Sequence, residues 1–450
     1  MKHLFLIRHA KSSWADEGLA DRDRPLNNRG EQQLQPLGKA LQRLAVFQSS
    51  DVFASDATRA RQTARGILPA DFPSDRFHID PGLYTFDFKR LLEWLKKLDD
   101  SIERVVVIGH NPALQELADW LAKHAPMALP TASFLHIRLP GKHWRKLDKN
   151  SGTLEHFLTP RNYSYREFER KHRNPIKRPA PGAITDLPAT LQLQAERLKQ
   201  LEPGVILGLD DEFLHQYRIA LRRSRALAEA IAEVSGTTRL RPAVAQLKRH
   251  ARATGRLRDL HVFLADLPAL CPDTPELRAA LETWAGGKAA SHQKRLAKRL
   301  GSVRYRNSLH SWESEIDSGK FRKLVSGLSG GDIRKAVLKR LRSFNRGTAE
   351  LLHTAPDEDF HKLRKQLKRI RYLMELDPGA RKQDLKTLRK RQDLYGRFQD
   401  LHIQLELLEQ FRKEAPETLP EAVAGIIDLI GQEKADTRRQ ILAMGGLGLG

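Results

Sequence analysis

Two histidines and two arginines in the first third of the chain have the types and the spacing needed to handle a phosphoryl group. Arg8 and His9 directly follow the apolar run HLFLI, Arg59 lies in DATRARQTA, and His110 closes RVVVIGH. A neutral imidazole is a nucleophile near pH 7, two guanidinium groups can hold the equatorial oxygens, and a second imidazole can donate a hydrogen bond. The set therefore suits phosphoryl transfer through a covalent intermediate.

Strands that alternate with helices must position these four residues. Through residue 160 the β-rich runs HLFLI, DVFAS, RVVVIGH and FLHIRL alternate with helical stretches such as EQQLQPLGKALQRL and FKRLLEWLKKL. This alternation predicts an α/β domain with a mainly parallel sheet covered on both faces. His9 and His110 fall at the carboxyl ends of strands, where open α/β sheets bind ligands. Arg59 falls in the first turn of a helix, where free N–H groups favour an anion.

Neither a metal nor another cofactor is expected. The sequence contains no His-Glu-x-x-His pattern and no cluster of carboxylates spaced to hold Mg²⁺ or Zn²⁺. A single cysteine, Cys271, excludes an internal disulfide framework and fits a reducing compartment. The apolar run in MKHLFLIRHA is too short for a signal peptide, and nothing approaches a membrane span. A cytoplasmic protein without a membrane partner is therefore expected.

Four motifs in order, LIRHA, RPLNNRG, SDATRARQTA and IGHNP, resemble those of the histidine phosphatase superfamily. The resemblance covers about residues 1–160 and is specifically to the small SixA-like phosphohistidine-phosphatase branch. It implies a phosphoglycerate-mutase-like, three-layer α/β/α fold and a phosphorylated protein or small phosphorylated compound as substrate. It further implies His9 as the phosphorylated nucleophile, with Arg8, Arg59 and His110 forming the phosphate pocket.

The sequence departs from the family pattern at two points. Ala10 stands where much of the superfamily has glycine, although a small side chain still allows close approach. No segment matches the acidic proton donor of larger members, so Asp16, Asp23 and Asp87 are guesses for that role. A site without a strong general acid favours phosphoramidates and phosphoanhydrides over simple esters, because their leaving groups are better.

A second set of cations lies in a region of long helical patterns. LHQYRIALRRSRAL at 214–227 and FHKLRKQLKRIRYL at 360–373 each carry a histidine followed by basic residues at offsets of three, seven and ten. This spacing gathers the four side chains on one helical face, where like charges repel. We therefore expect an anion to bind there. The residues are His215, Arg218, Arg222 and Arg225 in the first stretch and His361, Arg364, Lys368 and Arg371 in the second.

A further element is repeated some forty residues after each of these histidines. GRLRDLHVFL begins at Gly255 and GRFQDLHIQL begins at Gly396. The helical region is therefore predicted to contain two copies of one multi-helix unit, packed about a pseudo-twofold axis. The copies are not identical, because the position of Arg252 in the first is Asp393 in the second.

Together the two repeated elements resemble the CHAD domain, the conserved-histidine α-helical domain, over about residues 189–443. The resemblance implies an all-α domain of two pseudo-twofold-related helical bundles that binds inorganic polyphosphate, in some proteins at polyphosphate granules. Asp259 and Asp400 are expected to orient cations. By motif position, the implied polyphosphate contacts are His215, Arg218, Arg222, Arg223, Arg225, Arg256, His361, Arg364, Lys365, Lys368, Arg371 and Arg397.

Charge and composition divide the chain in the same way. The formal net charge is +23, with a sequence pI near 10.1. Roughly +4 falls on the first 160 residues, roughly +5 on the next 20 and roughly +14 on the remainder, so a polyanionic partner is expected for the second half. The predicted parts are a phosphatase domain over 1–160, a basic, proline-rich linker over 161–188, a CHAD domain over 189–443 and a flexible tail over 444–450.

Three functions compete on this evidence. The leading interpretation is a metal-independent histidine phosphatase coupled to a polyphosphate-binding module, located in the cytoplasm and at polyphosphate granules. The alternative is a polyphosphate-binding or targeting protein whose phosphatase activity is weak or regulatory. Nucleic-acid binding is disfavoured, because only 7% of the residues are aromatic and the basic stripes lack interleaved aromatic residues for base stacking.

Overall fold

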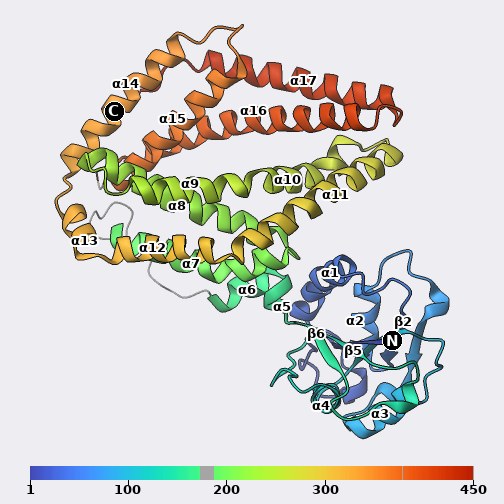
Figure 1. Ribbon diagram of the computed structural model, residues 1–450. Helices are drawn as coiled ribbons and strands as arrows, with labels where there is room; N and C mark the ends of the chain where they lie inside the picture. Colours follow the sequence, from blue (N-terminus) through green and yellow to red (C-terminus); the bar gives the residue numbers. More distant parts are fainter. Residues whose placement is uncertain (173–186, 378, 449–450) are drawn as a thin grey trace. The chain divides into compact units, whose positions relative to one another are not determined.

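The computed structural model describes residues 1–172, 187–377 and 379–448 (Figure 1). Two compact units make up the chain. The first consists of Met1–Asn174 with Leu207–Glu212, and the second of Pro175–Ile206 with Phe213–Gly450.

A six-stranded sheet forms the centre of the first unit, in the order β3-β2-β4-β1-β5-β6. The four strands from β3 to β1 are parallel, whereas β5 runs antiparallel to β1 and β6 antiparallel to β5. The strands are β1 (Lys2–Arg8), β2 (Asp51–Ser55), β3 (Phe77–Asp80), β4 (Arg104–Gly109), β5 (Phe134–Leu139) and β6 (Thr153–Leu158).

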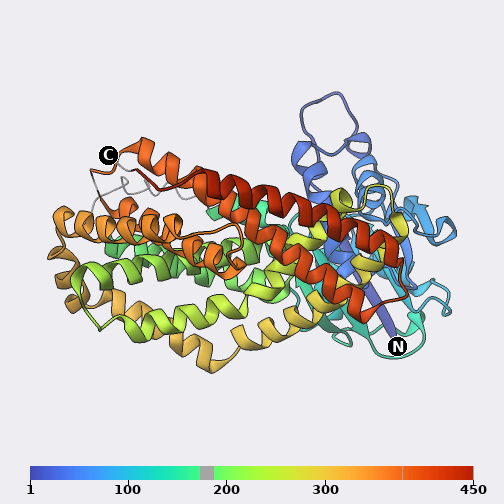
Figure 2. The ribbon, with the colours of Figure 1, turned by 90° about the horizontal axis from the view of Figure 1, so that it is seen from above.

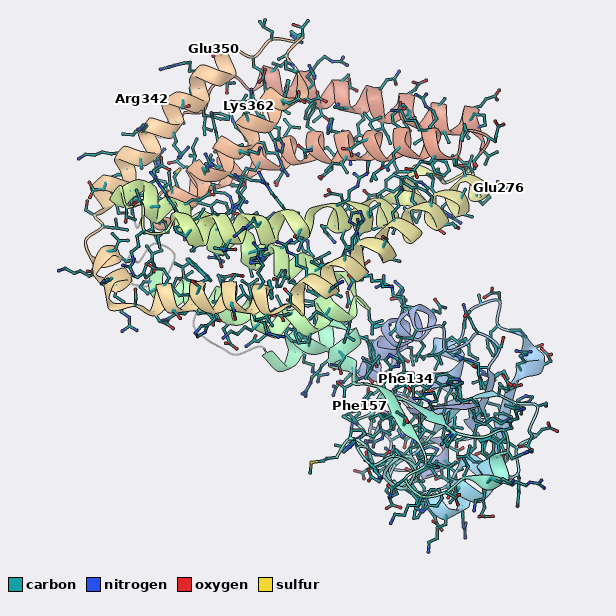
Figure 3. The ribbon with its side chains drawn as sticks, viewed as in Figure 1. Phe134, Phe157, Glu276, Arg342, Glu350 and Lys362 are labelled. Atoms are coloured by element: carbon teal, nitrogen blue, oxygen red, sulfur yellow. The ribbon has the colours of Figure 1, made fainter. Side chains whose placement is uncertain are left out.

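Helices cover both faces of this sheet. One apolar core packs under α1 (Asn28–Arg43) and α2 (Thr58–Ile67), and the other under α3 (Phe88–Lys96) and α4 (Ala113–Leu121). Two labelled phenylalanines mark the two cores in Figure 3. Phe134 on β5 belongs to the first, and Phe157 on β6 packs against the second. The expected three-layer α/β/α fold is confirmed.

Central and edge strands differ in how well the sequence predicts them. β1 and β4 lie in the middle of the sheet, so both faces are buried and the sequence shows an unbroken apolar run. β3 and β6 lie at the two edges and carry partly exposed, polar residues. For that reason the apolar pattern did not reveal them.

The segment predicted as a linker over 161–188 differs in its first part. It is helical in α5 (Pro160–Tyr163) and α6 (Tyr165–His172). Tyr163 and Phe168 are buried, and the Tyr163 hydroxyl donates a hydrogen bond to the Ala132 carbonyl at 2.6 Å. These aromatic side chains fix the segment to the first unit. Of the rest of the predicted linker, residues 173–186 lie outside the described residues, and residues 187–188 begin the helix α7 (Leu187–Leu207).

The described residues of the second unit form helices joined by short loops, with no strand among them. The first copy of the repeat consists of α8, α9, α10 and α11, and the second of α15, α16 and α17. Figures 1 and 2 show α16 and α17 running side by side along their length. The helices are α7 (Leu187–Leu207), α8 (Asp211–Ser235), α9 (Arg241–Ala253), α10 (Gly255–Leu270), α11 (Pro275–Leu300), α12 (Val303–Asp317), α13 (Gly319–Ser326), α14 (Gly330–Ala349), α15 (Asp357–Leu376), α16 (Lys382–Glu414) and α17 (Pro420–Ala443).

The copies differ at one helix break. α16 is continuous, whereas the matching region of the first copy divides at Thr254 into α9 and α10. Arg218 fills the break, since its guanidinium donates to the Ala251 carbonyl at 3.2 Å and to the Thr254 hydroxyl at 2.7 Å.

The predicted flexible tail differs as well, because its first residues are bound to the helices. The Arg391 guanidinium donates hydrogen bonds to the carbonyls of residues 444–446. Asn345 binds both the N–H and the carbonyl of Leu447, whose side chain is only 2% exposed. In the described part of the chain, no helix combines the length and apolarity needed to span a membrane.

Candidate functional sites

The predicted catalytic residues lie at or just after the ends of three neighbouring strands, β1, β2 and β4, at one edge of the sheet. β1 ends at Arg8 and pairs in parallel with β4, which ends at Gly109. The backbone N–H of His9 donates to the Gly109 carbonyl at 3.2 Å. The ring centroids of His9 and His110 lie 5.1 Å apart, so the two imidazoles share one pocket.

His9 is held in one tautomer. Its Nδ1 lies 2.7 Å from the Ala10 carbonyl oxygen, which can only accept, so Nδ1 carries the hydrogen and Nε2 carries the lone pair. The side chain is 7% exposed, and burial, followed by the charges of Arg59 and Arg8, lowers its pKa to about 4. His9 is therefore neutral at pH 7, with Nε2 as its nucleophilic atom.

His110 is buried more deeply, with 1% of its surface exposed. Its Nε2 lies 2.8 Å from the Ser55 hydroxyl, while Nδ1 has no hydrogen-bond partner among the described residues. Burial, His9 and Arg59 lower its pKa to about 3. If the Ser55 hydroxyl donates to Nε2, Nδ1 carries a hydrogen that a bound anion can accept.

The two arginines are anchored by backbone oxygens. Arg59, which is 3% exposed, donates to the carbonyl of Asp21 and to its carboxylate, the latter at 2.8 Å. Arg8 donates from Nη1 to the Leu129 carbonyl at 2.7 Å, and its buried Nε has no partner among the described residues. Burial lowers the pKa of Arg8. All four predicted catalytic residues thus lie together.

Two further residues at this pocket, Asp21 and Tyr84, escaped the sequence analysis. The Asp21 carboxylate accepts from Arg59, from Arg24 at 2.8 Å and from the Tyr84 hydroxyl at 2.9 Å. Burial acts to raise the pKa of Asp21, but the hydrogen bonds from Tyr84 and Arg59 outweigh it and lower that pKa. Asp21 is therefore an ionised partner of the arginines and not a proton donor at neutral pH.

Of the three acidic residues guessed as proton donors, two accept hydrogen bonds from nearby backbone N–H groups. Asp87 caps α3 by accepting from the Lys89 N–H at 2.8 Å, and Asp16 accepts from the Gly18 N–H at 3.0 Å. Asp23 lies in the short 3-10 helix η1 (Asp21–Asp23). The signal for Asp21 was its place in DRDRPLNNRG, directly before one of the family motifs.

The RPLNNRG motif supports the chain that follows His9. Asn27 caps α1 by accepting from the Gly30 N–H at 2.9 Å, and its own N–H donates to the Lys11 carbonyl at 3.0 Å. A Cβ on Gly30 would lie 2.2 Å from the same carbonyl oxygen, so only glycine fits. On the other side, the Ala10 N–H donates to the Thr63 hydroxyl of α2 at 3.0 Å.

In the second unit, the two basic stripes face each other. Arg222 on α8 acts electrostatically on Arg364 and Lys368 of α15, and the charge of Arg222 helps to lower the pKa of both. Burial is the largest cause in each case, and it brings the pKa of Lys368 to about 7. The stripes therefore form one cluster of cations, which we call the cation cluster: Arg218, Arg222, Arg225, Arg364, Lys365, Lys368 and Arg371.

Equivalent acidic residues accompany this cluster in both copies. Asp259 acts on Arg218 and Asp400 on Arg364, each working against the loss of charge that burial favours. This placement fits the orienting role expected for the two aspartates. Glutamates four residues beyond the last arginine of each stripe form a second pair of equivalents. They are Glu229, 3.6 Å from Arg225, and Glu375, 2.7 Å from Arg371.

Lys365 extends the cluster toward α9. Burial and the charges of Lys248, Arg369 and Arg252 lower its pKa, which shows that α9 adds cations on this side. Arg252 is therefore a further basic residue of the cluster, and its counterpart Asp393 gives the second copy no such charge. Arg223 is an exposed residue of α8, as are Arg222 and, on α15, Lys365.

The remaining predicted contacts bind protein groups. Arg256 donates to Glu406 at 2.9 Å and to Gln410 at 2.6 Å on α16, which links the two copies. Arg397 donates to Glu433 of α17 at 2.7 Å. The two equivalents thus have different partners.

The repeated histidines lie at the edge of the same stripes. His361 is hydrogen-bonded to Gln399 at 2.6 Å, and burial lowers its pKa. His215 is half-buried on α8. Among residues 1–172, 187–377 and 379–448, no group of three or more His, Cys, Asp or Glu side chains is arranged to hold a metal ion.

Comparisons with known proteins match two separate parts of the chain. The family model of the histidine phosphatase superfamily (branch 1) matches residues 4–93, and that of the CHAD domain matches residues 189–409. An uncharacterized protein of Mycobacterium tuberculosis (strain H37Rv) is 33% identical over 168 residues, which cover 34% of this chain and 100% of that protein.

Two solved structures are similar to the separate parts. The protein histidine phosphatase SixA complexed with tungstate is 22% identical, with a TM-score of 0.30, and the match covers 36% of this chain and 98% of that one. The CHAD domain from the plant Ricinus communis is 23% identical, with a TM-score of 0.48, and the match covers 60% of this chain and 94% of that one.

Proposed function

The chain belongs to the histidine phosphatase superfamily and carries a CHAD domain, and from this premise we propose that it is a phosphatase that forms a phosphohistidine on His9 and binds inorganic polyphosphate through its helical unit. The observation that carries the first half is the tautomer of His9. Its Nδ1 hydrogen is held by the Ala10 carbonyl, which leaves Nε2 as the nucleophile.

The reaction follows from this arrangement. His9 Nε2 attacks phosphorus, the bond from phosphorus to the leaving group breaks, and the leaving group departs with the bonding electrons. Arg8 and Arg59 hold the equatorial oxygens, and His110 Nδ1 donates to one of them. Water then attacks the phosphohistidine, releasing inorganic phosphate and restoring the neutral imidazole. No metal takes part in this scheme.

The leaving group is one that needs no strong acid. Asp21, the carboxylate hydrogen-bonded to Arg59, is kept ionised by its hydrogen bonds and cannot supply a proton. Phosphohistidine meets this condition when its distal ring nitrogen carries a proton, because the imidazole then leaves as a neutral molecule. We therefore place phosphoramidates, with phosphohistidine foremost, ahead of simple phosphate esters.

The cation cluster supports the second half of the proposal. Seven cations from two helices converge, most of them half-buried, and the four carboxylates beside them leave an excess of positive charge. A chain of phosphates offsets that repulsion and releases its condensed counterions on binding, so many modest contacts sum to tight, salt-sensitive binding. At polyphosphate granules, this module would hold the phosphatase beside its substrates.

One observation favours the alternative function, a polyphosphate-binding protein with weak phosphatase activity. The Asp21 carboxylate binds the guanidinium of Arg59, so a substrate phosphate must compete with a carboxylate for that cation. The rate of phosphate release decides between the two functions.

The catalytic proposal is tested with His9→Ala. Phosphate release from phosphohistidine and trapping of the phosphoenzyme by quenching in alkaline denaturant, where the P–N bond survives, are measured in the presence of EDTA. We expect the wild-type chain to turn over and to carry an acid-labile phosphoryl group, and the variant to lose both. Undiminished turnover by His9→Ala, or complete loss of wild-type activity in EDTA, would refute the mechanism.

The binding proposal is tested separately with the double variant Arg222→Ala/Lys368→Ala. Its affinity for long-chain polyphosphate should fall by at least tenfold at fixed salt. Lys339→Ala/Arg342→Ala is the matched control, because it also removes two positive charges and both residues are exposed on α14, where Figure 3 labels Arg342. Equal losses in the two variants would show that only the overall charge matters. Competition with RNA at the same salt tests selectivity.

A further inference from the structure

An exposed aromatic ring lies against the buried His110. The Phe86 ring centroid is 5.6 Å from that of His110, although 45% of Phe86 is exposed. Tyr84 contacts the same imidazole edge-on at 5.4 Å and lies 5.6 Å from Phe86. The two aromatic rings therefore connect a catalytic imidazole to the surface.

Their backbone is fixed on both sides. The 3-10 helix η3 (Pro81–Leu83) precedes Tyr84, and α3 follows with Asp87 as its N-cap. Between them, the buried Thr85 accepts a hydrogen bond from the Asp87 N–H at 3.2 Å. The guanidinium carbons of Arg22 and Arg59 lie 5.3 Å and 6.0 Å from the centroid of the Tyr84 ring. Phe86 is thus presented by a rigid segment and does not depend on a loop that must order first.

The other exposed aromatic ring of this domain has a different role. Trp14 is 72% exposed, but the Arg24 guanidinium covers one face at 3.2 Å from the ring centroid. Arg24 also binds Asp21 and the Ser12 hydroxyl, so this stack stabilises the loop that carries Asp21. Phe86 instead lies against His110, one imidazole of the catalytic pair.

We propose that Phe86 determines substrate specificity by stacking against a planar aromatic leaving group, and that the imidazole of phosphohistidine is the group it accepts. This inference rests on the proposed function. A leaving group must depart from the pocket of His9 and His110 toward solvent, and Phe86 is the half-exposed ring in contact with that pocket. Offset or edge-to-face packing of two rings accounts for a three- to tenfold preference.

Two substrates isolate this preference. Phosphohistidine and phosphoramidate both contain a P–N bond, but only phosphohistidine presents a ring to Phe86. The measured quantity is the ratio of kcat/KM for phosphohistidine to kcat/KM for phosphoramidate. For Phe86→Ala and Phe86→Leu, we expect this ratio to fall about three- to tenfold, mainly through KM of phosphohistidine. Phe86→Trp keeps an aromatic face and should retain the ratio.

A matched control removes another exposed apolar side chain. Ile79→Ala on β3 changes a residue that is 39% exposed and should leave the ratio unchanged. A structural role for Phe86 would lower kcat for both substrates equally and leave the ratio intact, and that result would overturn the inference while the proposed function stood. If the wild-type chain hydrolysed neither compound, the proposed function would fail, and the inference with it.

Discussion

Lys368 gives the cation cluster a dependence on pH that can be measured. It stands on α15 at the position that Arg222 occupies on α8. Burial, followed by the charges of Arg364, Arg222 and Arg371, lowers its pKa from 10.5 to about 7. Without an anion, this lysine is half neutral at pH 7. An anion in the cluster favours the ammonium form and so binds together with a proton.

The magnitude follows from the pKa. A fall from 10.5 to about 7 makes the charged form ~5 kcal/mol less favourable than in water. The protonated fraction in the free protein falls from about one half at pH 7 to about one hundredth at pH 9. If bound polyphosphate keeps the lysine charged over this interval, the association constant should fall ~50-fold between the two pH values.

The free energy of unfolding also depends on the protonation of Lys368, but it changes with pH in the opposite direction to the affinity for polyphosphate. Between pH 7 and 10.5 the unfolded chain keeps a proton on Lys368 that the folded, anion-free chain has released. The contribution of this site to the free energy of unfolding therefore rises with pH across that interval. Below pH 7 both states are protonated, and the full electrostatic penalty remains.

The assay is titration of the full chain with long-chain polyphosphate at constant ionic strength from pH 7 to 9. Lys368→Arg restores the residue of the first copy and should flatten the dependence to within about threefold, because arginine stays charged. Lys362→Arg is the control, since Lys362 lies on the same helix but is 72% exposed and paired with Asp359 (Figure 3). A ~50-fold fall that persisted in Lys368→Arg would refute the reasoning, as would a wild-type affinity that does not change with pH.

Three further predictions concern other parts of the molecule. Because burial lowers the pKa of His9 to about 4, kcat/KM for phosphoramidate should be level from pH 6 to 8 and fall only near pH 4 as the nucleophile is protonated; a midpoint near 6.5 would contradict this. Gly30→Ala should cost ~1–3 kcal/mol in thermal unfolding through the clash with the Lys11 carbonyl, whereas Gly286→Ala, in open space on α11, should not destabilise. Glu229→Gln with Glu375→Gln should tighten polyphosphate binding severalfold, because each glutamate competes for a stripe arginine; weaker binding would show that the pairs serve to orient the arginines.

The sequence was most informative where one local rule decided the structure. Apolar runs located the buried strands β1 and β4, and the position of His9 and His110 after them placed both imidazoles at one edge of the sheet. Helical periodicity placed each basic stripe on one face. The internal repeat then predicted that the two stripes belong to equivalent elements, and the structure brings them together.

Side chains that act through tertiary contacts could not be found in this way. Asp21 and Tyr84 come from separate connections and meet only in the folded chain, where the Tyr84 hydroxyl and the Arg59 guanidinium both donate to the Asp21 carboxylate. Motif position also assigned equal roles to Arg256 and Arg397. Their neighbours on α16 and α17 differ, and a carboxylate or amide in reach decides where each guanidinium goes.

The two sites use the same physical device for different ends. Burial beside guanidinium groups disfavours a further positive charge, and it lowers the pKa of His9 and of Lys368 alike. In the imidazole, the loss of the proton exposes a lone pair, so the cost of burial creates a nucleophile. In the lysine, burial favours the neutral form when no anion is bound. The binding of an anion therefore requires the lysine to take up a proton. The difference lies in the ordinary pKa of the side chain: burial moves histidine well below neutral pH, but brings lysine only down to it.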